Sequence, residues 1–249
     1  GDPHLQAAEQ GLTIEYKSAL LPQLYPWAQQ QAEQSKFRTV GIYSGPLGFG
    51  VNTELVAKKK LPVPACWKDL LAPAWKGEVM LGNPNSSGTA YLMLATLVQV
   101  MGEEEAFRYL RELHRNVNQY ARSGIGPMTA VTRGETAIGS TVLHGVINEI
   151  VRGFPVLPVL PCEGVGYEIG STAILKGARN VDAARRFVDF ALSPAGQQVG
   201  LDVKEYAIPT HRGVALPPQV HVLAAIIMLV AITIIVISST RRSKTATDA

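Results

Sequence analysis

The chain has 249 residues, of which 23 are Lys or Arg and 20 are Asp or Glu, giving a formal net charge of +3 at pH 7. With 47% hydrophobic and 17% charged residues, the composition excludes an intrinsically disordered protein, and the Gly and Pro contents exclude collagen-like and low-complexity classes. The small net charge gives no support for nucleic-acid binding, which usually needs clustered Lys and Arg.

Residues 1–212 alternate between helical and strand patterns. Apolar residues at helical spacing predict helices over residues 23–35, 103–115 and 182–192. Short apolar runs bounded by Gly or Pro predict strands over residues 39–43, 78–81, 137–140, 156–160 and 171–175. Strands that alternate with helices favour βαβ units, so we expect an α/β fold with mostly parallel sheets.

The last part of the chain has a different composition. Residues 213–240 carry no formal charge, and Thr233 is the sole polar residue within residues 222–237. A bilayer is spanned by about 20 mostly apolar residues, so residues 220–239 are predicted to form a transmembrane helix. The alternatives are a buried core helix or a pair of hydrophobic strands. The basic residues within 240–249 would then lie in the cytoplasm.

The two cysteines, Cys66 and Cys162, are too few for a disulfide framework and lack the CxxC spacing of zinc sites. Their separation permits one disulfide bond but does not imply it. We therefore expect free, partly buried thiols, which are common in protein cores.

The first candidate site is a turn between a predicted strand and a helical run. Ser86, Ser87, Gly88 and Thr89 lie in NPNSSGTA, after EVML and before YLMLATLVQVM. A Ser- and Gly-rich turn at a helix start directs backbone N–H groups and hydroxyls at an anion. The absence of GxxxxGK[ST] excludes a nucleotide P-loop. The alternative is that a serine merely caps the helix.

Three further positions are candidates for solute contacts. Ser123 and Gly124 lie in SGIGP, a second small-residue turn before a helical stretch. His144 follows the strand AIGST, and Glu163 lies in the loop PCEGVG. The ordinary alternatives are a plain loop, a core histidine and a solvated glutamate. No GxSxG, HExxH or kinase signature is present in the sequence, so catalysis is not expected.

Four segments in order resemble one known family: LPVPACWKDLLAPAWKGEVMLGNPNSSGTAY, SGIGPMTAVTRGETAIG, GFPVLPVLPCEGVGYEIGSTAILKGARN and FALSPAGQQ. They are similar to the periplasmic solute-binding proteins of ABC transporters. The nearest branch contains ferric-iron-binding proteins and their hexose-phosphate- and phosphonate-binding relatives.

The resemblance implies a two-lobed, type II periplasmic-binding-protein fold with the solute in a cleft between the lobes. Both small-residue turns would face that cleft, and the hinge would cross at residues 38–53 and near Glu163. The first lobe would be incomplete, because family members normally carry more βα units before the matching stretch. The implied division of the chain is lobe 1 and hinge 1–51, lobe 2 52–157, return to lobe 1 158–212, linker 213–219, transmembrane helix 220–239 and basic tail 240–249.

The resemblance also bears on the solute. Iron-binding members use two adjacent tyrosines at about the position of Leu143, His144 and Gly145, and this sequence has no adjacent Tyr pair. Sugar-phosphate-binding members are similar at His144 and Glu163, although an Asp is replaced by Gly145. The expected solute is therefore a small anion, a hexose phosphate or phosphonate, bound without metal or cofactor.

An ABC permease would be the partner, and the location would be the periplasm, with residues 220–239 as an anchor in the inner membrane. The first 20 residues show no secretory signal, which requires a basic stretch before an apolar one. Three alternatives remain open at this point. They are a non-functional remnant of such a protein, a ferric-iron-binding protein, and a single-span membrane sensor or interaction protein.

Overall fold

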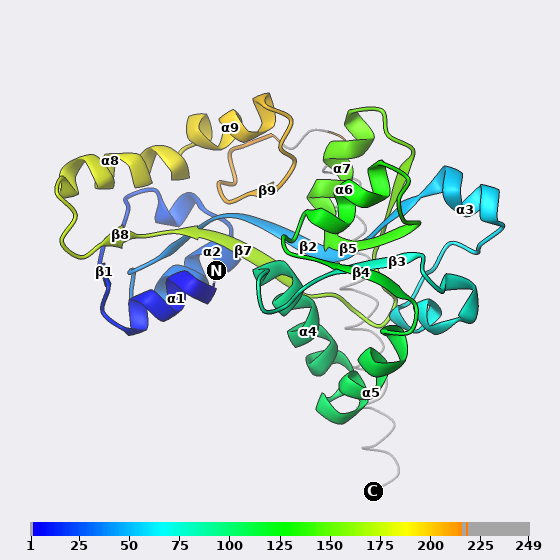
Figure 1. Ribbon diagram of the computed structural model, residues 1–249. Coiled ribbons are helices and arrows are strands. Elements are labelled where there is room, and N and C mark those ends of the chain that lie inside the picture. The colour runs from blue at the N-terminus through cyan, green and yellow to red at the C-terminus, as the bar shows by residue number, and fades with distance from the viewer. Residues whose placement is uncertain (1, 216–217, 219–249) are drawn as a thin grey trace, which may run out of the picture. The chain divides into compact units, whose positions relative to one another are not determined.

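The computed structural model describes residues 2–215 and residue 218 (Figure 1). Their helices and strands, in chain order, are α1 Asp2–Glu9, β1 Thr13–Ile14, η1 Leu21–Gln23, α2 Pro26–Gln34, β2 Val40–Asn52, α3 Thr53–Lys59, η2 Trp67–Leu71, η3 Pro73–Trp75, β3 Val79–Gly82, α4 Gly88–Met101, α5 Glu103–Leu113, β4 Val117–Ala121, α6 Gly126–Thr132, β5 Ile138–Val142, α7 Leu143–Val151, β6 Val156–Val159, β7 Tyr167–Thr172, β8 Ile174–Leu175, α8 Val181–Leu192, α9 Pro194–Asp202 and β9 Ile208–Pro209.

The predicted helices correspond to α2, α5 and α8, and the α/β class is confirmed. The prediction of mostly parallel sheets is wrong. Strand β3 pairs in parallel with β4 and β5, whereas β2 pairs antiparallel with β5, β6, β7 and β9. Helical crossovers enforce parallel pairing only within the β3–β4–β5 unit. An alternating pattern does not reveal that a long strand from outside this unit runs in the opposite direction.

Strand β2 is much longer than the predicted strand over residues 39–43. Its first part pairs with β7, and its second part, from Leu47 to Asn52, pairs with β5 and β6. The glycines that suggest a strand end are instead sites of close packing. A Cβ atom on Gly50 would lie 2.4 Å from Met128 Sδ, and one on Gly48 would lie 2.4 Å from the carbonyl oxygen of Val159. Glycine within a strand often marks such an approach.

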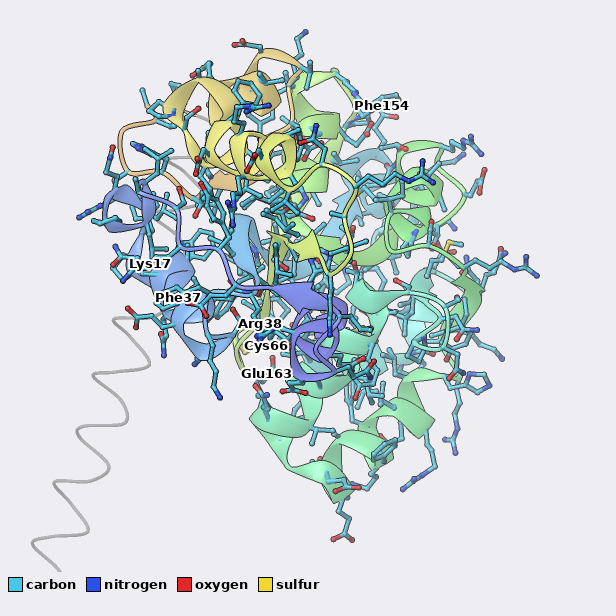
Figure 2. The ribbon with its side chains drawn as sticks, turned by 90° about the vertical axis from the view of Figure 1, so that its left-hand side faces the viewer. Lys17, Phe37, Arg38, Cys66, Phe154 and Glu163 are labelled. Carbon is cyan, nitrogen blue, oxygen red and sulfur yellow. A yellow bond between two sulfur atoms is a disulfide. The ribbon has the colours of Figure 1, made fainter. Side chains whose placement is uncertain are left out.

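Two apolar cores lie along β2. The larger core is built from β2, β3, β5, η2, α4 and α5, and includes the fully buried Trp67 and Trp75. The smaller core is built mainly from α2, α8 and the start of β2, and includes Leu24, Val188 and Leu192. At its border the Lys17 ammonium lies 4.8 Å from the centre of the Phe37 ring (Figure 2).

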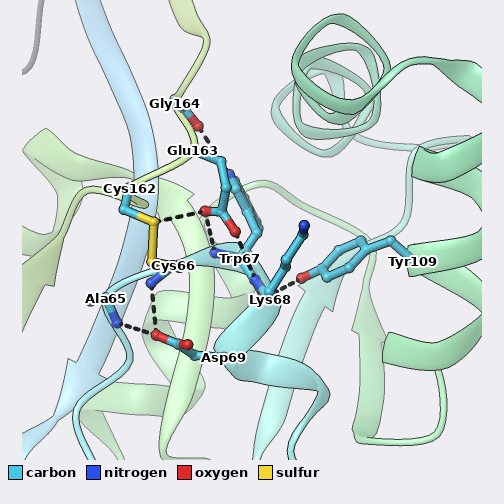
Figure 3. Close-up of a disulfide and its surroundings, with 9 residues drawn as sticks. All are labelled: Ala65, Cys66, Trp67, Lys68, Asp69, Tyr109, Cys162, Glu163 and Gly164. Carbon is cyan, nitrogen blue, oxygen red and sulfur yellow. Dashed lines mark hydrogen bonds between the residues drawn. A yellow bond between two sulfur atoms is a disulfide. The ribbon is translucent and has the colours of Figure 1, made fainter. Parts of the chain in front are cut away.

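A disulfide bond joins Cys66 to Cys162 across 96 residues of sequence (Figure 3), so the expectation of free thiols is wrong. The Cys162 amide donates to the Ala65 carbonyl at 2.8 Å, and the two Cα atoms are 4.7 Å apart. Disulfide formation depends on this spatial approach, which the sequence separation does not reveal.

Within residues 2–215 and at residue 218, no helix has the length and apolar character needed to cross a membrane. The predicted transmembrane helix at 220–239 and the basic tail at 240–249 lie outside the described residues. Of the predicted linker at 213–219, the structure describes residues 213–215 and residue 218.

Candidate functional site

A cavity of about 710 Å³ opens between α1 and α2 on one side and the starts of α4 and α6 on the other, with β7 as a third wall. Its volume falls within the ~300–1,000 Å³ typical of small-molecule sites. The residues that line it are Leu5, Trp27, Gln30, Gln31, Gln34, Ser86, Ser87, Gly88, Thr89, Leu92, Arg122, Ser123, Gly124, Tyr167, Glu168 and Ile169. Six of the predicted solute-binding residues are therefore brought together here.

The first turn is shaped by local hydrogen bonds after β3. The Asn83 carboxamide oxygen accepts from the Asn85 amide at 2.9 Å, and the Asn83 carbonyl accepts from the Ser87 amide at 3.0 Å. Ser87 is the N-cap of α4, because its hydroxyl accepts from the Ala90 amide at 3.2 Å. The amides of Gly88 and Thr89 belong to the first turn of this 14-residue helix, where the helix dipole favours an anion.

The second turn lies directly against the first. Strands β3 and β4 run parallel, with Gly82 paired to Ala121, so the turns that follow them start from the same sheet edge. The Ser86 hydroxyl donates to the Arg122 carbonyl at 2.9 Å. A Cβ atom on Gly124 would lie 2.5 Å from Thr89 Oγ1. The glycine is thus required for the turns to meet.

The Ser123 hydroxyl accepts from the Gly126 amide at 3.2 Å and supports the start of α6. Two helix starts therefore converge on one end of the cavity. Among the residues that line it, Arg122 is the sole cation and Glu168 the sole acid. This end provides hydroxyls, backbone donors and one guanidinium, a set suited to a phosphate or carboxylate.

Sequence reasoning missed Glu168, the acidic wall of the cavity. Thr89 Oγ1 lies 3.5 Å from Glu168 Oε2, and the Tyr43 hydroxyl bonds to the same carboxylate. Burial raises the pKa of Glu168, while the positive charge of the N-terminus and the bonds from Thr89 and Tyr43 act in the opposite direction. The sequence offered one indication of this residue. An acidic side chain in the middle of the strand YEIGST is unusual, because charged side chains are rarely buried without a partner.

His144 lies outside this cavity. It begins α7, is only 9% exposed, and lines a second cavity of about 380 Å³ with Tyr43 and Glu205. Its Nε2 atom lies 3.7 Å from Glu205 Oε1. Burial lowers the pKa of His144, although Glu205 opposes that effect. The Tyr43 ring stands edge-on to the imidazole, with ring centroids 6.0 Å apart.

Glu163 lines neither cavity. Its two carboxylate oxygens accept from the backbone amides of Trp67 at 2.7 Å and Lys68 at 3.0 Å, at the start of η2 (Figure 3). The Trp67 indole donates to the Gly164 carbonyl at 3.0 Å. These bonds and the adjacent disulfide attach the segment after β6 to η2. The contacts of Glu163 in this structure therefore hold two segments of the chain together.

One group of metal-ligand residues lies close together in the described part of the chain, namely Cys66, Cys162 and Glu163, with ligand atoms within 4.8 Å of one another. The two sulfur atoms are bonded to each other. Because a metal binds thiolates, this donor set does not fit a metal while the disulfide is intact.

The sequence matches the family model for bacterial extracellular solute-binding proteins over residues 3–220. An uncharacterized protein of Haemophilus influenzae is 51% identical over 199 residues, which cover 80% of this chain and 58% of that protein. The phosphoglycerate transport regulatory protein PgtC of Salmonella typhimurium is 27% identical over 209 residues, covering 80% of this chain and 50% of PgtC. The chain thus spans between half and three fifths of the length of these relatives.

Among solved structures, the periplasmic binding protein AfuA of Actinobacillus pleuropneumoniae, with exogenous fructose 6-phosphate bound, is 43% identical with a TM-score of 0.84. The periplasmic binding protein P5PA is 39% identical with a TM-score of 0.82. Each alignment covers 88% of this chain and 69% of the other. Iron-bound HitA of Pseudomonas aeruginosa, at 21% identity and a TM-score of 0.72 over 87% of this chain and 69% of HitA, shares the fold. The chain belongs to the bacterial extracellular solute-binding protein family.

Proposed function

We propose that this chain binds a phosphorylated small solute, with a hexose phosphate as the first candidate, as the binding component of an ABC importer. The observation that carries the proposal is the convergence of the α4 and α6 starts on one end of a 710 Å³ cavity. The similarity to AfuA, whose structure holds fructose 6-phosphate, supports the same class of solute.

The phosphate would lie at the helix starts. There the amides of Gly88, Thr89 and Gly124 and the guanidinium of Arg122 supply donors and positive charge. The serine hydroxyls add neutral donors, which complete the coordination of the phosphate oxygens without further charge. The sugar hydroxyls would face the glutamines of α2, which line the opposite wall, and Glu168 of β7, which lines the third wall.

The proposal includes the two-lobe division into residues 1–51, 52–157 and 158–212. In support, most of the larger core comes from residues between Val56 and Val142, and the smaller core comes from residues 21–40 and 174–192. The larger core also includes Leu47, Phe49 and Val51 of β2, next to the proposed boundary. Closure of such lobes on a solute is a common hinge motion. It would present the loaded form to a permease in the periplasm. Membrane attachment through residues 220–239 is part of this proposal.

Ferric iron is the less suitable solute. The cavity end described here offers neutral hydroxyls, N–H donors and Arg122, all of which favour an anion over a cation. HitA supports a shared fold alone, because its identity to this chain is 21%. At the position where iron-binding members are expected to carry adjacent tyrosines, the sequence has Leu143, His144 and Gly145.

Calorimetric titration with fructose 6-phosphate, 3-phosphoglycerate, inorganic phosphate and Fe³⁺ tests the proposal. We expect fructose 6-phosphate to bind, and Arg122→Gln to weaken binding about tenfold or more, because a charge-assisted hydrogen bond is lost. Arg179→Gln is the matched control, since Arg179 is exposed and outside the cavity. Binding of Fe³⁺ alone, or equal affinity in both variants, would contradict the proposal.

A further inference from the structure

Glu168 lies against the turn to which the proposed function assigns the phosphate. Its Oε2 atom is 3.5 Å from the hydroxyl of Thr89, the second residue of α4. The sole acid of the cavity lining therefore lies beside the turn proposed for the anion. A phosphate bound at the start of α4 would bring a second negative charge close to the Glu168 carboxylate.

The surroundings of Glu168 compensate its negative charge in part, because the positive charge of the N-terminus favours the ionised carboxylate. Tyr43 of β2 and Thr89 of α4 bond to its carboxylate, and Arg122 lines the same cavity. His4 of α1 bonds instead to Ser171 of β7 at 2.8 Å.

His144 of α7 and Glu205, which precedes β9, lie behind the Tyr43 ring. In the described part of the chain no Lys or Arg side chain forms an ion pair with Glu168.

We infer that Glu168 takes up a proton when the anionic solute binds, so that solute capture and protonation of this side chain are coupled. The inference rests on the proposed function. Two like charges within a few ångströms of each other disfavour joint ionisation. A protonated carboxyl group is also a hydrogen-bond donor, so the proton converts Glu168 from a repelling neighbour into a contact for a phosphate or hydroxyl oxygen.

The direction of the effect follows from linkage. Burial already raises the pKa of Glu168 in the free protein, and an adjacent anion raises it further. The complex therefore binds more protons than the free protein. The affinity is highest below the free-state pKa and falls as the pH rises toward the bound-state pKa, by up to tenfold per pH unit.

Calorimetry in pairs of buffers with different ionisation enthalpies measures the number of protons taken up on binding. Fructose 6-phosphate is the first probe. The phosphate group of this probe has a second pKa of about 6 and can itself take up a proton. A hexose 6-sulfate, which stays singly charged, is therefore the second probe. Three proteins are compared, namely the wild type, Glu168→Gln and Glu112→Gln. Glu112 is an exposed residue of α5 outside the cavity and serves as the matched control.

We expect the wild type and Glu112→Gln to take up a fraction of a proton with both probes in the pH range between the free-state and the bound-state pKa of Glu168. We expect Glu168→Gln to take up fewer protons and to gain about tenfold in affinity at the upper end of this range. Equal proton numbers in wild type and Glu168→Gln would overturn the inference while leaving the proposed function intact. Failure of both probes to bind any of the three folded proteins would overturn the proposed function, and the inference with it.

Discussion

The two cores differ in the size of the side chains that they bury. In the larger core the side chains of Trp67, Trp75 and Phe49 are fully buried between the sheet and its helices. In the smaller core α8 buries Val188 and Leu192 but leaves Phe187 63% and Phe190 51% exposed. Clusters of large exposed apolar side chains are uncommon on the surfaces of soluble proteins.

The proposed phosphate site lies next to the larger core. The first turn starts from β3 and leads into α4, and both elements contribute to the larger core. The second turn is held against the first by the bond from the Ser86 hydroxyl to the Arg122 carbonyl. Preorganised donors bind an anion without first having to be ordered. The opposite wall is lined by Leu5 of α1 and by residues of α2, and α2 contributes to the smaller core. Donor positions would therefore be fixed by the larger core.

The contrast is tested most strongly by removing one large side chain from each region. Trp67→Ala should lower the free energy of unfolding by about 3–5 kcal/mol. It removes a buried ring that packs edge-on against Phe49, with centroids 4.7 Å apart, and donates to Gly164. Phe187→Ala should change it by less than about 0.5 kcal/mol, because the ring is mostly exposed. Urea unfolding measures the free energy of unfolding of both variants. Similar losses of stability in the two variants would contradict the difference between the two regions.

Removing the disulfide should have the next largest effect. Replacement of Cys66 and Cys162 by Ser opens a loop of 96 residues, and disulfides typically contribute about 2–4 kcal/mol by restricting the unfolded chain. Thermal unfolding of the double variant, compared with the wild type under reducing and non-reducing conditions, measures the loss. A midpoint insensitive to both treatments would show that the bond does not stabilise the larger core.

Glu163→Gln separates a structural role from a solute contact. One carboxylate oxygen becomes an amide nitrogen, so one of the two bonds to the Trp67 and Lys68 amides is lost. The expected cost is about 1–2 kcal/mol, with no change in affinity for fructose 6-phosphate. A loss of affinity without a loss of stability would instead assign Glu163 to the solute, as the family resemblance implied.

Ser87→Ala should lower the free energy of unfolding by about 1 kcal/mol, because it removes the N-cap of α4. Ser193→Ala is the matched control, since the Ser193 hydroxyl caps α9 by accepting from the Gly196 amide at 3.1 Å. Both variants should lose similar stability, but only Ser87→Ala should bind the solute more weakly. Equal solute affinity of both variants would mean that the α4 start does not contact the solute.

Local patterns were sufficient to predict α2, α5, α8 and most strands of the sheet, because periodicity and Gly or Pro punctuation act over short distances. They also identified both turns of the cavity, since each has a Ser- and Gly-rich strand-to-helix signature. What they could not provide was long-range information. The direction of β2, the pairing of Cys66 with Cys162 and the break between β7 and β8, predicted as one strand, all depend on distant segments.

The same limit explains the other candidate residues. His144 and Glu163 were selected one at a time, and only the fold shows that neither lines the larger cavity. Glu168 reaches Thr89 across 79 residues of sequence, so no local pattern marks their contact. The solute roles of all these residues remain predictions until binding is measured.

The most direct test is amide chemical-shift mapping in ¹H–¹⁵N spectra during titration with fructose 6-phosphate. If the phosphate binds at the convergent helix starts, the largest changes should fall on the amides of Gly88, Thr89 and Gly124, with smaller ones near Glu168. Saturating changes confined to the surroundings of His144 or Glu163, or no changes at millimolar solute, would contradict the proposed site.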